Sequence, residues 1–409
     1  MTKLVTIRRH APSHARGLCK VETATVTTSC ATEIFARCAP LAAGNSRNGC
    51  RLQAQAIYES LAAMLEQLGG AMGHVVIEKV FLRKVVADFH AFEEARIDAY
   101  RRHGISGQRL PATTYVGQPP CMPGQDVELQ VYAVVPTSPG SARVQHLSPA
   151  NEHVTVKLVE IGQVRHLYIS NVSGEGRDHV PLGPFRQQSD AMFDTALEVL
   201  RENGTSFREV LRTWIYLDDI DRDYQALNDS RNAFFQRENV ERLPASTGIG
   251  GKLHPRGTLC TLDVYALLNP AVAQVEVMHT PTLNDAPQYG SSFSRGMKMA
   301  LPEQTYLFIS GTASVDECGR TAHVGDVRGQ LERMLLNIEG LLTPQGATWA
   351  DLVQGVTFLK SPDYAELYRE LCEERGMVQL PHTIVQADVC RPELLSEMEA
   401  IAVVPNRRA

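Results

Sequence analysis

The chain has 409 residues, a net charge of −6 at pH 7 and a pI of about 6.1, with 44% hydrophobic and 21% charged residues. This balance is typical of a folded globular protein and argues against a nucleic-acid binder, which needs a basic face to displace counterions. The sequence shows no signal peptide and no run of about 18 apolar residues, and its nine cysteines lack CxxC spacing, so we expect a cytoplasmic protein with free thiols, no membrane contact, no metal and no other cofactor.

Three segments of the chain repeat one order of predicted elements. They run from about Thr23 to Pro136, from Val154 to Leu268 and from Ser291 to Val404. Each segment begins with an apolar strand, and the three strands read ATEIFARCAPLA, HLYISNVSGEG and TYLFISGTAS. A period near 130 residues is too long for a solenoid and indicates tandem domains.

An amphipathic helix follows each first strand. Apolar residues recur at helical spacing in all three segments, at Ile57, Leu61, Met64, Leu65 and Leu68, then at Phe193, Leu197 and Leu200, and finally at Leu331, Met334, Leu335, Ile338 and Leu342. Gly69 and Gly204 suit left-handed caps, and Pro344 prevents the third helix from continuing.

The second half of each segment predicts a strand, a helix and a terminal strand. The strands HVVIEKVFL, EVLRTWIYL and DLVQGVTFL precede helices that we expect to begin near Phe89, Tyr224 and Tyr364. Arg96 and Arg231 lie seven residues into the first two of these helices. A Leu-Pro step then leads to the terminal strands VELQVYAVV, CTLDVYALL and LSEMEAIAV.

This order predicts an α+β fold in which each repeat is a mixed β-sheet covered by two helices on one face. We place the repeats at residues 1–145, 150–275 and 286–409, with the first degenerate. The segments 137–152 and 269–288 are rich in Pro, Ser, Ala and Asn and are predicted as linkers.

The last terminal strand carries two carboxylates among aliphatic residues. Alternation places Glu397 and Glu399 on one face and Met398 and Ala400 on the other. Either this is a half-exposed edge strand with solvated acids, or one carboxylate faces a cleft where partial burial raises its pKa and makes it a usable acid.

The repeated pattern resembles the RidA/YjgF family. That resemblance implies chorismate-mutase-like domains, which assemble as trimers with ligand clefts between protomers. Three repeats in one chain would form a pseudo-trimer with three unequal clefts. The family's carboxylate-binding arginine, expected just after the Leu-Pro-Ala step, is absent from Ala112-Thr113-Thr114, Ala245-Ser246-Thr247 and His382-Thr383-Ile384.

The second and third repeats, about residues 154–404, resemble the chorismatase family. The matching stretches are LPASTGIGG at 243–251, YGSSFSRG at 289–296, FISGTAS at 308–314 with HVGDVRGQ at 323–330, and ADVCRPELLSEMEA at 387–400. By this resemblance Glu397 is the catalytic glutamate, with Gln130 and Asp263 at the equivalent places. The chain departs from the family at two places. At 228–231 it reads NDSR and keeps only the arginine of the family's Cys-x-Gly-Arg, and at 274–278 QVEVM replaces an expected Asn-Pro-Arg-Gln.

The resemblance implies a substrate with two carboxylates and an enol ether. Glu397 would protonate the enolpyruvyl methylene carbon. Arginines suit the substrate carboxylates because a guanidinium can pair with a carboxylate in a bidentate way. The candidate substrate-binding residues, by resemblance, are Arg295, Arg231, Arg391, Cys390, Ala313 and Tyr216. Cys390 and Ala313 would shape the ring product. The alternatives are surface ion pairing for Arg231, a solvated Arg391, a simple buried thiol at Cys390 and a packing role for Tyr216.

Three functions remain open at this point. The first is a cofactor-independent chorismatase-like hydrolase that releases pyruvate and a hydroxybenzoate or a dihydroxycyclohexadiene carboxylate. The second is a Rid-type protein that binds a small molecule or scavenges enamines or imines without the deaminase arginine. The third is a non-catalytic pseudo-enzyme. The expected partner is a small carboxylate such as chorismate, and the expected state is a monomeric pseudo-trimer or a higher homo-oligomer.

Overall fold

The computed structural model describes residues 5–13, 19–41, 49–148, 154–176 and 180–406. Within these ranges the chain forms three six-stranded mixed sheets. In each sheet one strand pair is parallel and the remaining pairs are antiparallel. In the described part of the chain, no helix is long and apolar enough to cross a membrane.

The first sheet has the order β1-β2-β3-β6-β4-β5. Its elements are β1 (Thr6–Ser13), β2 (Cys19–Thr27), β3 (Ala31–Pro40), α1 (Gly49–Gln67), β4 (Val75–Leu82), α2 (Val85–Arg102), β5 (Ala112–Val116) and β6 (Val127–Pro136).

The second and third sheets repeat this arrangement, with the orders β11-β10-β12-β9-β8-β7 and β13-β14-β15-β18-β16-β17. The second contains β7 (Ala142–Leu147), β8 (Thr155–Ile161), β9 (Val164–Ser173), α3 (Phe185–Glu202), β10 (Val210–Leu217), α4 (Ile220–Arg237), β11 (Ala245–Gly250) and β12 (Cys260–Leu267). The third contains β13 (Gln274–Val277), β14 (Gly296–Ala300), β15 (Gln304–Ala313), α5 (Val327–Leu342), β16 (Leu352–Leu359), α6 (Ala365–Glu374), β17 (His382–Gln386) and β18 (Ser396–Pro405).

The first helix of each repeat lies where its apolar spacing predicts. Gly69 and Gly204 have left-handed φ values of 77° and 72° just beyond α1 and α3, which a residue without a Cβ adopts at no steric cost. The second helices α2 and α4 begin four residues earlier than expected, because the chain turns into a helix directly after the preceding strand.

Three of the six strands in each sheet were not predicted from the sequence. Both predicted linkers are wrong in part, since residues 137–152 contain β7 of the second sheet and residues 269–288 contain β13 of the third. The short strands β5, β11 and β17 after each Leu-Pro step were also missed. The domain boundaries at 145/150 and 275/286 stay predictions, although β7 and β13 begin ahead of them; residues 150 and 409 lie outside the described residues.

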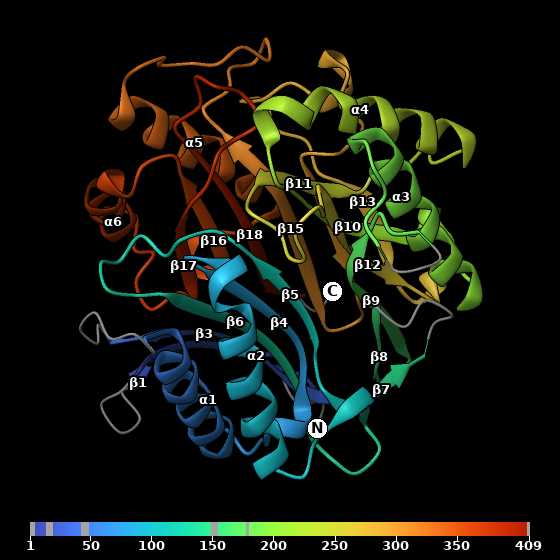
Figure 1. Ribbon diagram of the computed structural model, residues 1–409, viewed down its shortest axis with the longest axis vertical. Coiled ribbons are helices and arrows are strands. Elements are labelled where there is room, and N and C mark those ends of the chain that lie inside the picture. Colours follow the sequence, from blue (N-terminus) through green and yellow to red (C-terminus); the bar gives the residue numbers. More distant parts are fainter. Residues whose placement is uncertain (1–4, 14–18, 42–48, 149–153, 177–179, 407–409) are drawn as a thin grey trace.

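The sheets face one another and the helices lie on the outside (Figure 1). Each helix pair packs on its own sheet in a separate apolar core, whereas two further clusters combine residues from all three sheets. Strand pairing makes Phe81, Tyr216 and Phe358 equivalent positions of β4, β10 and β16. All three side chains meet in one of the shared clusters, as expected around a pseudo-threefold axis.

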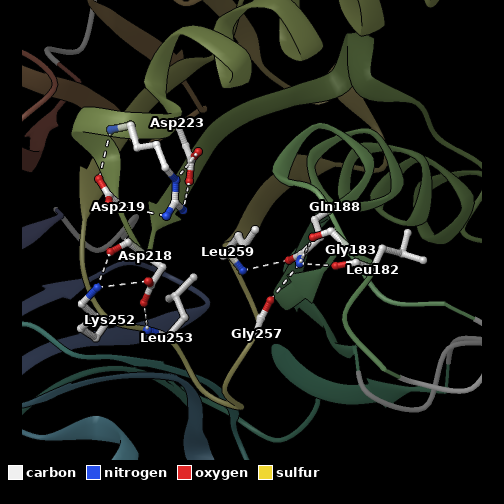
Figure 2. Close-up of polar contacts among 11 residues, drawn as sticks. Leu182, Gly183, Gln188, Asp218, Asp219, Asp223, Lys252, Leu253, Gly257 and Leu259 are labelled. Atoms are coloured by element: carbon white, nitrogen blue, oxygen red, sulfur yellow. Dashed lines mark hydrogen bonds and ion pairs between the residues drawn. The ribbon is translucent and has the colours of Figure 1, made fainter.

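Hydrogen bonds connect the loop that follows β11 to Gln188 of α3 and to Asp218, which follows β10 (Figure 2). Gln188 of α3 donates to Gly257 O at 2.8 Å and accepts from Leu259 N at 2.8 Å. Asp218 accepts from Lys252 Nζ at 3.1 Å. Asp219 caps α4 by accepting from the backbone N of Arg222 at 3.0 Å. These contacts hold β11 and α4 in place, and both elements contribute to the cleft described next.

Candidate active site

A cleft of about 240 Å³ lies between the second and third sheets. The second repeat contributes residues of α4 and β11 to its wall. The third repeat contributes the segment before β14, the end of β15, the loop 387–395 and the start of β18. The two repeats are joined beside this wall, where Ser246 N of β11 donates to Ser310 Oγ of β15 at 2.9 Å and Ser294 N donates to Pro244 O at 3.0 Å.

Glu397 lies on β18 and faces this cleft. β18 is an interior strand between β15 and β16, with Glu397 opposite Ala313 on one side and Phe358 on the other. The edge-strand alternative is therefore wrong. The side chains alternate as predicted, since Met398, Ala400 and Ala402 pack into the helix-side core. The whole residue is only 4% exposed.

Burial, and then the nearby carboxylate of Glu399, raise the pKa of Glu397 to about 8 against the opposing charges of Arg295 and Arg212. In the described part of the chain Glu397 accepts no hydrogen bond of its own. At pH 7 the Glu397 side chain is therefore mainly an uncharged carboxylic acid that faces the cleft and can donate its proton.

Gly311 makes room for this acid. β15 has an irregular register between Ile309 and Thr312, and a Cβ on Gly311 would come within 2.1 Å of Glu397 Oε1. The backbone N of Gly311 donates to Thr247 Oγ1 at 3.0 Å. The neighbouring hydroxyls of Thr312 and Ser314 donate to Ser310 O and Ala322 O, both at 2.9 Å, so both hydroxyls already make hydrogen bonds to the backbone of their own repeat.

Two arginines of the cleft flank one aromatic ring. The guanidinium carbons of Arg231 and Arg295 lie 5.4 and 5.5 Å from the ring centroid of Phe293. Arg231 donates to Asn228 Oδ1 at 2.6 Å, and Arg295 donates to Asn284 O at 2.8 Å. Both arginines are buried, and both line the cleft with Glu397. A planar cation held in this way is oriented to receive a carboxylate.

Arg391, Cys390 and Ala313 also line the cleft. Arg391 is half-buried and donates to Gly319 O at 2.9 Å, so it is not merely a solvated charge. Burial raises the pKa of the Cys390 thiol to about 12, with a further contribution from the charge of Glu397. Cys390 is therefore a neutral thiol at physiological pH, which argues against a role as a thiolate nucleophile.

Comparison with known proteins agrees with this architecture. Residues 284–404 match the family model described as endoribonuclease L-PSP. The chain is 27% identical over 252 residues to 3-hydroxybenzoate synthase of Streptomyces hygroscopicus, which covers 54% of this chain and 71% of that protein. It is 29% identical over 119 residues to a RutC family protein of Pyrococcus abyssi, covering 29% and 90%. A chorismatase crystal structure superposes with a TM-score of 0.61 at 17% identity, covering 92% of this chain and all of that one, which shows a shared fold.

This chain is thus similar to a 3-hydroxybenzoate synthase in sequence and to a chorismatase in fold, and its third repeat matches the endoribonuclease L-PSP family model. The predicted α+β fold of three tandem RidA-like domains is confirmed. The fold brings six of the seven predicted site residues to one cleft, namely Glu397, Arg295, Arg231, Arg391, Cys390 and Ala313. Tyr216 does not line it and instead packs in the apolar cluster that also contains Phe81 and Phe358.

The predicted correspondence between the repeats is wrong by two residues. Gln130 pairs with Lys79, and Asp263 pairs with Trp214. Lys79 and Trp214 occupy the same position in β4 and β10 as Val356 does in β16, and Val356 pairs with Glu399. Glu399, and not Glu397, is thus the equivalent of Gln130 and Asp263. Two carboxylates on one strand face look alike in sequence, and only the strand pairing distinguishes them.

The true counterparts of Glu397 are Glu128 and Thr261, paired with Phe81 and Tyr216. The third repeat is therefore not alone in carrying a glutamate at this position. Glu128 differs in its surroundings, because Arg37 donates to Glu128 Oε2 at 2.9 Å and to Glu22 Oε2 at 2.9 Å. An arginine of its own repeat already pairs with Glu128, so this carboxylate is part of a buried ion pair.

Residues behind Glu397 were not found by sequence reasoning. Arg212, Trp214 and Thr247 of the second repeat form a polar layer with Glu399. One signal was present, since Arg212 interrupts the apolar strand VLRTWIYL just as the two glutamates interrupt β18. A charge in a strand that is buried on both faces needs a partner, and that partner lies in another repeat.

Proposed function

We propose that this protein hydrolyses the enolpyruvyl ether of chorismate, with Glu397 as the general acid. The observation that carries the proposal is a buried carboxylic acid with a pKa of about 8 in a cleft that it shares with Arg231, Arg295 and Arg391. The similarity to 3-hydroxybenzoate synthase supports the same substrate class.

In the proposed reaction the arginines bind the two substrate carboxylates. The Glu397 carboxyl donates its proton to the methylene carbon of the enolpyruvyl group, which leaves an oxocarbenium-like centre on the adjacent carbon. The new Glu397 carboxylate stabilises that positive charge. Water, or a hydroxyl of the substrate, attacks the cation and returns a proton to Glu397. Collapse of the adduct releases pyruvate and the ring product.

The ring product is a dihydroxycyclohexadiene carboxylate if water adds and the ring keeps both oxygens, or a hydroxybenzoate if the ring also loses water. We propose that Cys390 and Ala313 influence this choice, because both line the cleft and Ala313 lies directly opposite Glu397. The three repeats then act as a pseudo-trimer with one working cleft, between the second and third repeats.

The test is to incubate the purified protein with chorismate and to measure pyruvate and the ring product. Release of pyruvate with either ring product supports the proposal. If no pyruvate forms, the chorismatase assignment is refuted, and the Rid-type binding or scavenging function becomes the leading hypothesis. A scavenger would be recognised by faster release of ammonia from enamine or imine substrates, which the same preparation can be assayed for.

A further inference from the structure

A layer of polar side chains lies directly behind Glu397, away from the cleft. Its centre is Glu399, two residues further along the same face of β18 and only 6% exposed. Glu399 accepts hydrogen bonds from Arg212 at 2.7 Å and from Trp214 Nε1 at 3.1 Å. Beyond it a cavity of about 80 Å³ lies among the three sheets, and Lys79 of the first repeat lies there with its Nζ 3.9 Å from Glu399.

A chain of contacts connects this layer to the acid. The same Arg212 nitrogen that binds Glu399 also donates to Thr247 Oγ1. Thr247 Oγ1 accepts from the backbone N of Gly311, and Gly311 is the residue over which the Glu397 carboxyl lies. Arg212 is 2% exposed and stacks 4.9 Å from the Trp214 ring centroid. Such an enclosed side chain holds its partners in one geometry.

We propose that Glu399, fixed by Arg212 and Trp214, is a positioning residue whose negative charge keeps the Glu397 proton in place at neutral pH while Arg212 and Thr247 fix the strand beneath the acid. This inference rests on the proposed function, in which Glu397 is the proton donor. The family resemblance points to Glu397 alone, and Glu399 has a separate role behind it.

The charges around Glu397 explain why such a residue is needed. On the cleft side the elements packed against it bring three arginines, Arg231, Arg295 and Arg391, and the neutral thiol of Cys390 and the phenol of Tyr224. On the far side Arg212 also faces it. Cations favour the carboxylate and would make Glu397 release its proton before substrate arrives.

Glu399 opposes these cations from the far side. It offsets Arg212 directly, and Lys79 Nζ, whose pKa burial lowers to about 8, lies 3.9 Å from its carboxylate. Asp263, the counterpart of Glu399 in the second repeat, accepts from Thr114 at 2.7 Å, and burial raises its pKa. Burial first, and then the charge of Glu399, leave Glu397 mainly protonated at pH 7 although arginines surround it.

The experiment compares Glu399→Gln with wild type in two measurements. In the pH dependence of kcat, the loss of activity at alkaline pH should move about one unit lower, which reduces turnover roughly tenfold at pH 9 and hardly at all at pH 6. In protein labelled with carbon-13 at the glutamate side-chain carboxyls, the Glu397 resonance, identified by its absence in Glu397→Gln, should titrate at correspondingly lower pH. The second measurement requires no substrate.

The matched control is Glu33→Gln. Glu33 lines the same central cavity, burial raises its pKa, and it accepts from Tyr132 Oη at 2.5 Å. It does not face Glu397, so this variant should keep the wild-type pH profile. A double variant, Arg212→Gln with Glu399→Gln, removes a positive and a negative charge together and should return the profile most of the way to wild type.

An unchanged Glu397 titration in folded Glu399→Gln protein overturns the inference, as does an activity loss that is equal at pH 6 and pH 9. Failure of the proposed function looks different. In that case wild-type protein releases no pyruvate, while the carboxyl titration still shows whether Glu399 controls the proton of Glu397. If Glu399→Gln does not fold, the double variant decides, because a profile shifted by a full unit there would contradict the charge argument.

Discussion

Replacing Glu397 by glutamine is the sharpest perturbation of the proposed mechanism. Glutamine has nearly the same shape but cannot donate a carboxylic proton. With a pKa of about 8, the wild-type acid is roughly 90% protonated at pH 7 and roughly 10% at pH 9. Wild-type turnover should therefore fall about tenfold between these pH values. Glu397→Gln should lower kcat by roughly 10²–10⁴-fold, equivalent to about 3–5 kcal/mol of transition-state stabilisation, and should lose this pH dependence.

The structure also predicts that the variant stays folded and still binds substrate. Glu397 accepts no hydrogen bond in the described part of the chain, so glutamine breaks none. Its folded-state pKa is raised above the ordinary value of 4.5, so ionising it costs stability that grows as the pH rises from about 4.5 toward 8. Glutamine removes that cost, and the melting temperature at pH 7 should not fall.

The assay is pyruvate release from chorismate, with the Michaelis constant and the melting temperature measured on the same preparation. The matched control is Glu128→Gln, the same change at the equivalent position of the first repeat, where Arg37 keeps a partner in Glu22. That control should keep the wild-type kcat. The reasoning is refuted if folded Glu397→Gln turns over chorismate at the wild-type rate, or if Glu128→Gln abolishes turnover.

Three further results are expected. Arg295→Ala should raise the Michaelis constant more than it lowers kcat, because it removes a carboxylate partner, and the reverse order in steady-state kinetics would contradict that role. Gly311→Ala places a methyl group 2.1 Å from the position of Glu397 Oε1 and should lower kcat roughly 10²-fold through misplacement of the acid, which wild-type turnover in a folded variant would disprove. Calorimetry with the inactive Glu397→Gln protein should show one chorismate per chain, and a stoichiometry of two or three would show that other clefts bind.

The helices and long strands could be predicted from sequence because their signals are local. Leucines at helical spacing, glycines at helix ends and a run such as TYLFISGTAS each carry their own periodicity. The strands that were missed lack this property. β13 has only the four residues QVEV, and β7 has two polar residues before its last leucine. Both are strands because a neighbouring strand supplies hydrogen-bond partners, and no short window of sequence contains that information.

The site was predictable to the extent that its residues resemble a family motif. Glu397, Arg295 and Arg231 come from three separate stretches, and the resemblance placed them together before any contact was known. The resemblance did not supply the strand register. The observed register makes Gln130 equivalent to Glu399 and not to Glu397. Nor did the resemblance supply Arg212, whose partner Glu399 lies 187 residues away. Pairings between repeats depend on how the sheets meet.

Fusing three domains in one chain allows equivalent positions to take unequal roles. The position of Glu397 is occupied by Glu128 in the first repeat and by Thr261 in the second. The position of Glu399 is occupied by Gln130 in the first repeat and by Asp263 in the second. Two of these residues make contacts between repeats: Gln130 donates to Gly355 O of the third repeat at 2.8 Å, and Asp263 accepts from Thr114 of the first. Glu128 pairs with Arg37 of its own repeat. A homotrimer could not make these changes at one cleft alone, because every substitution would appear at all three. In a single chain, residues at the equivalent positions of two repeats can take structural roles while the third repeat keeps a buried carboxylic acid that faces the cleft.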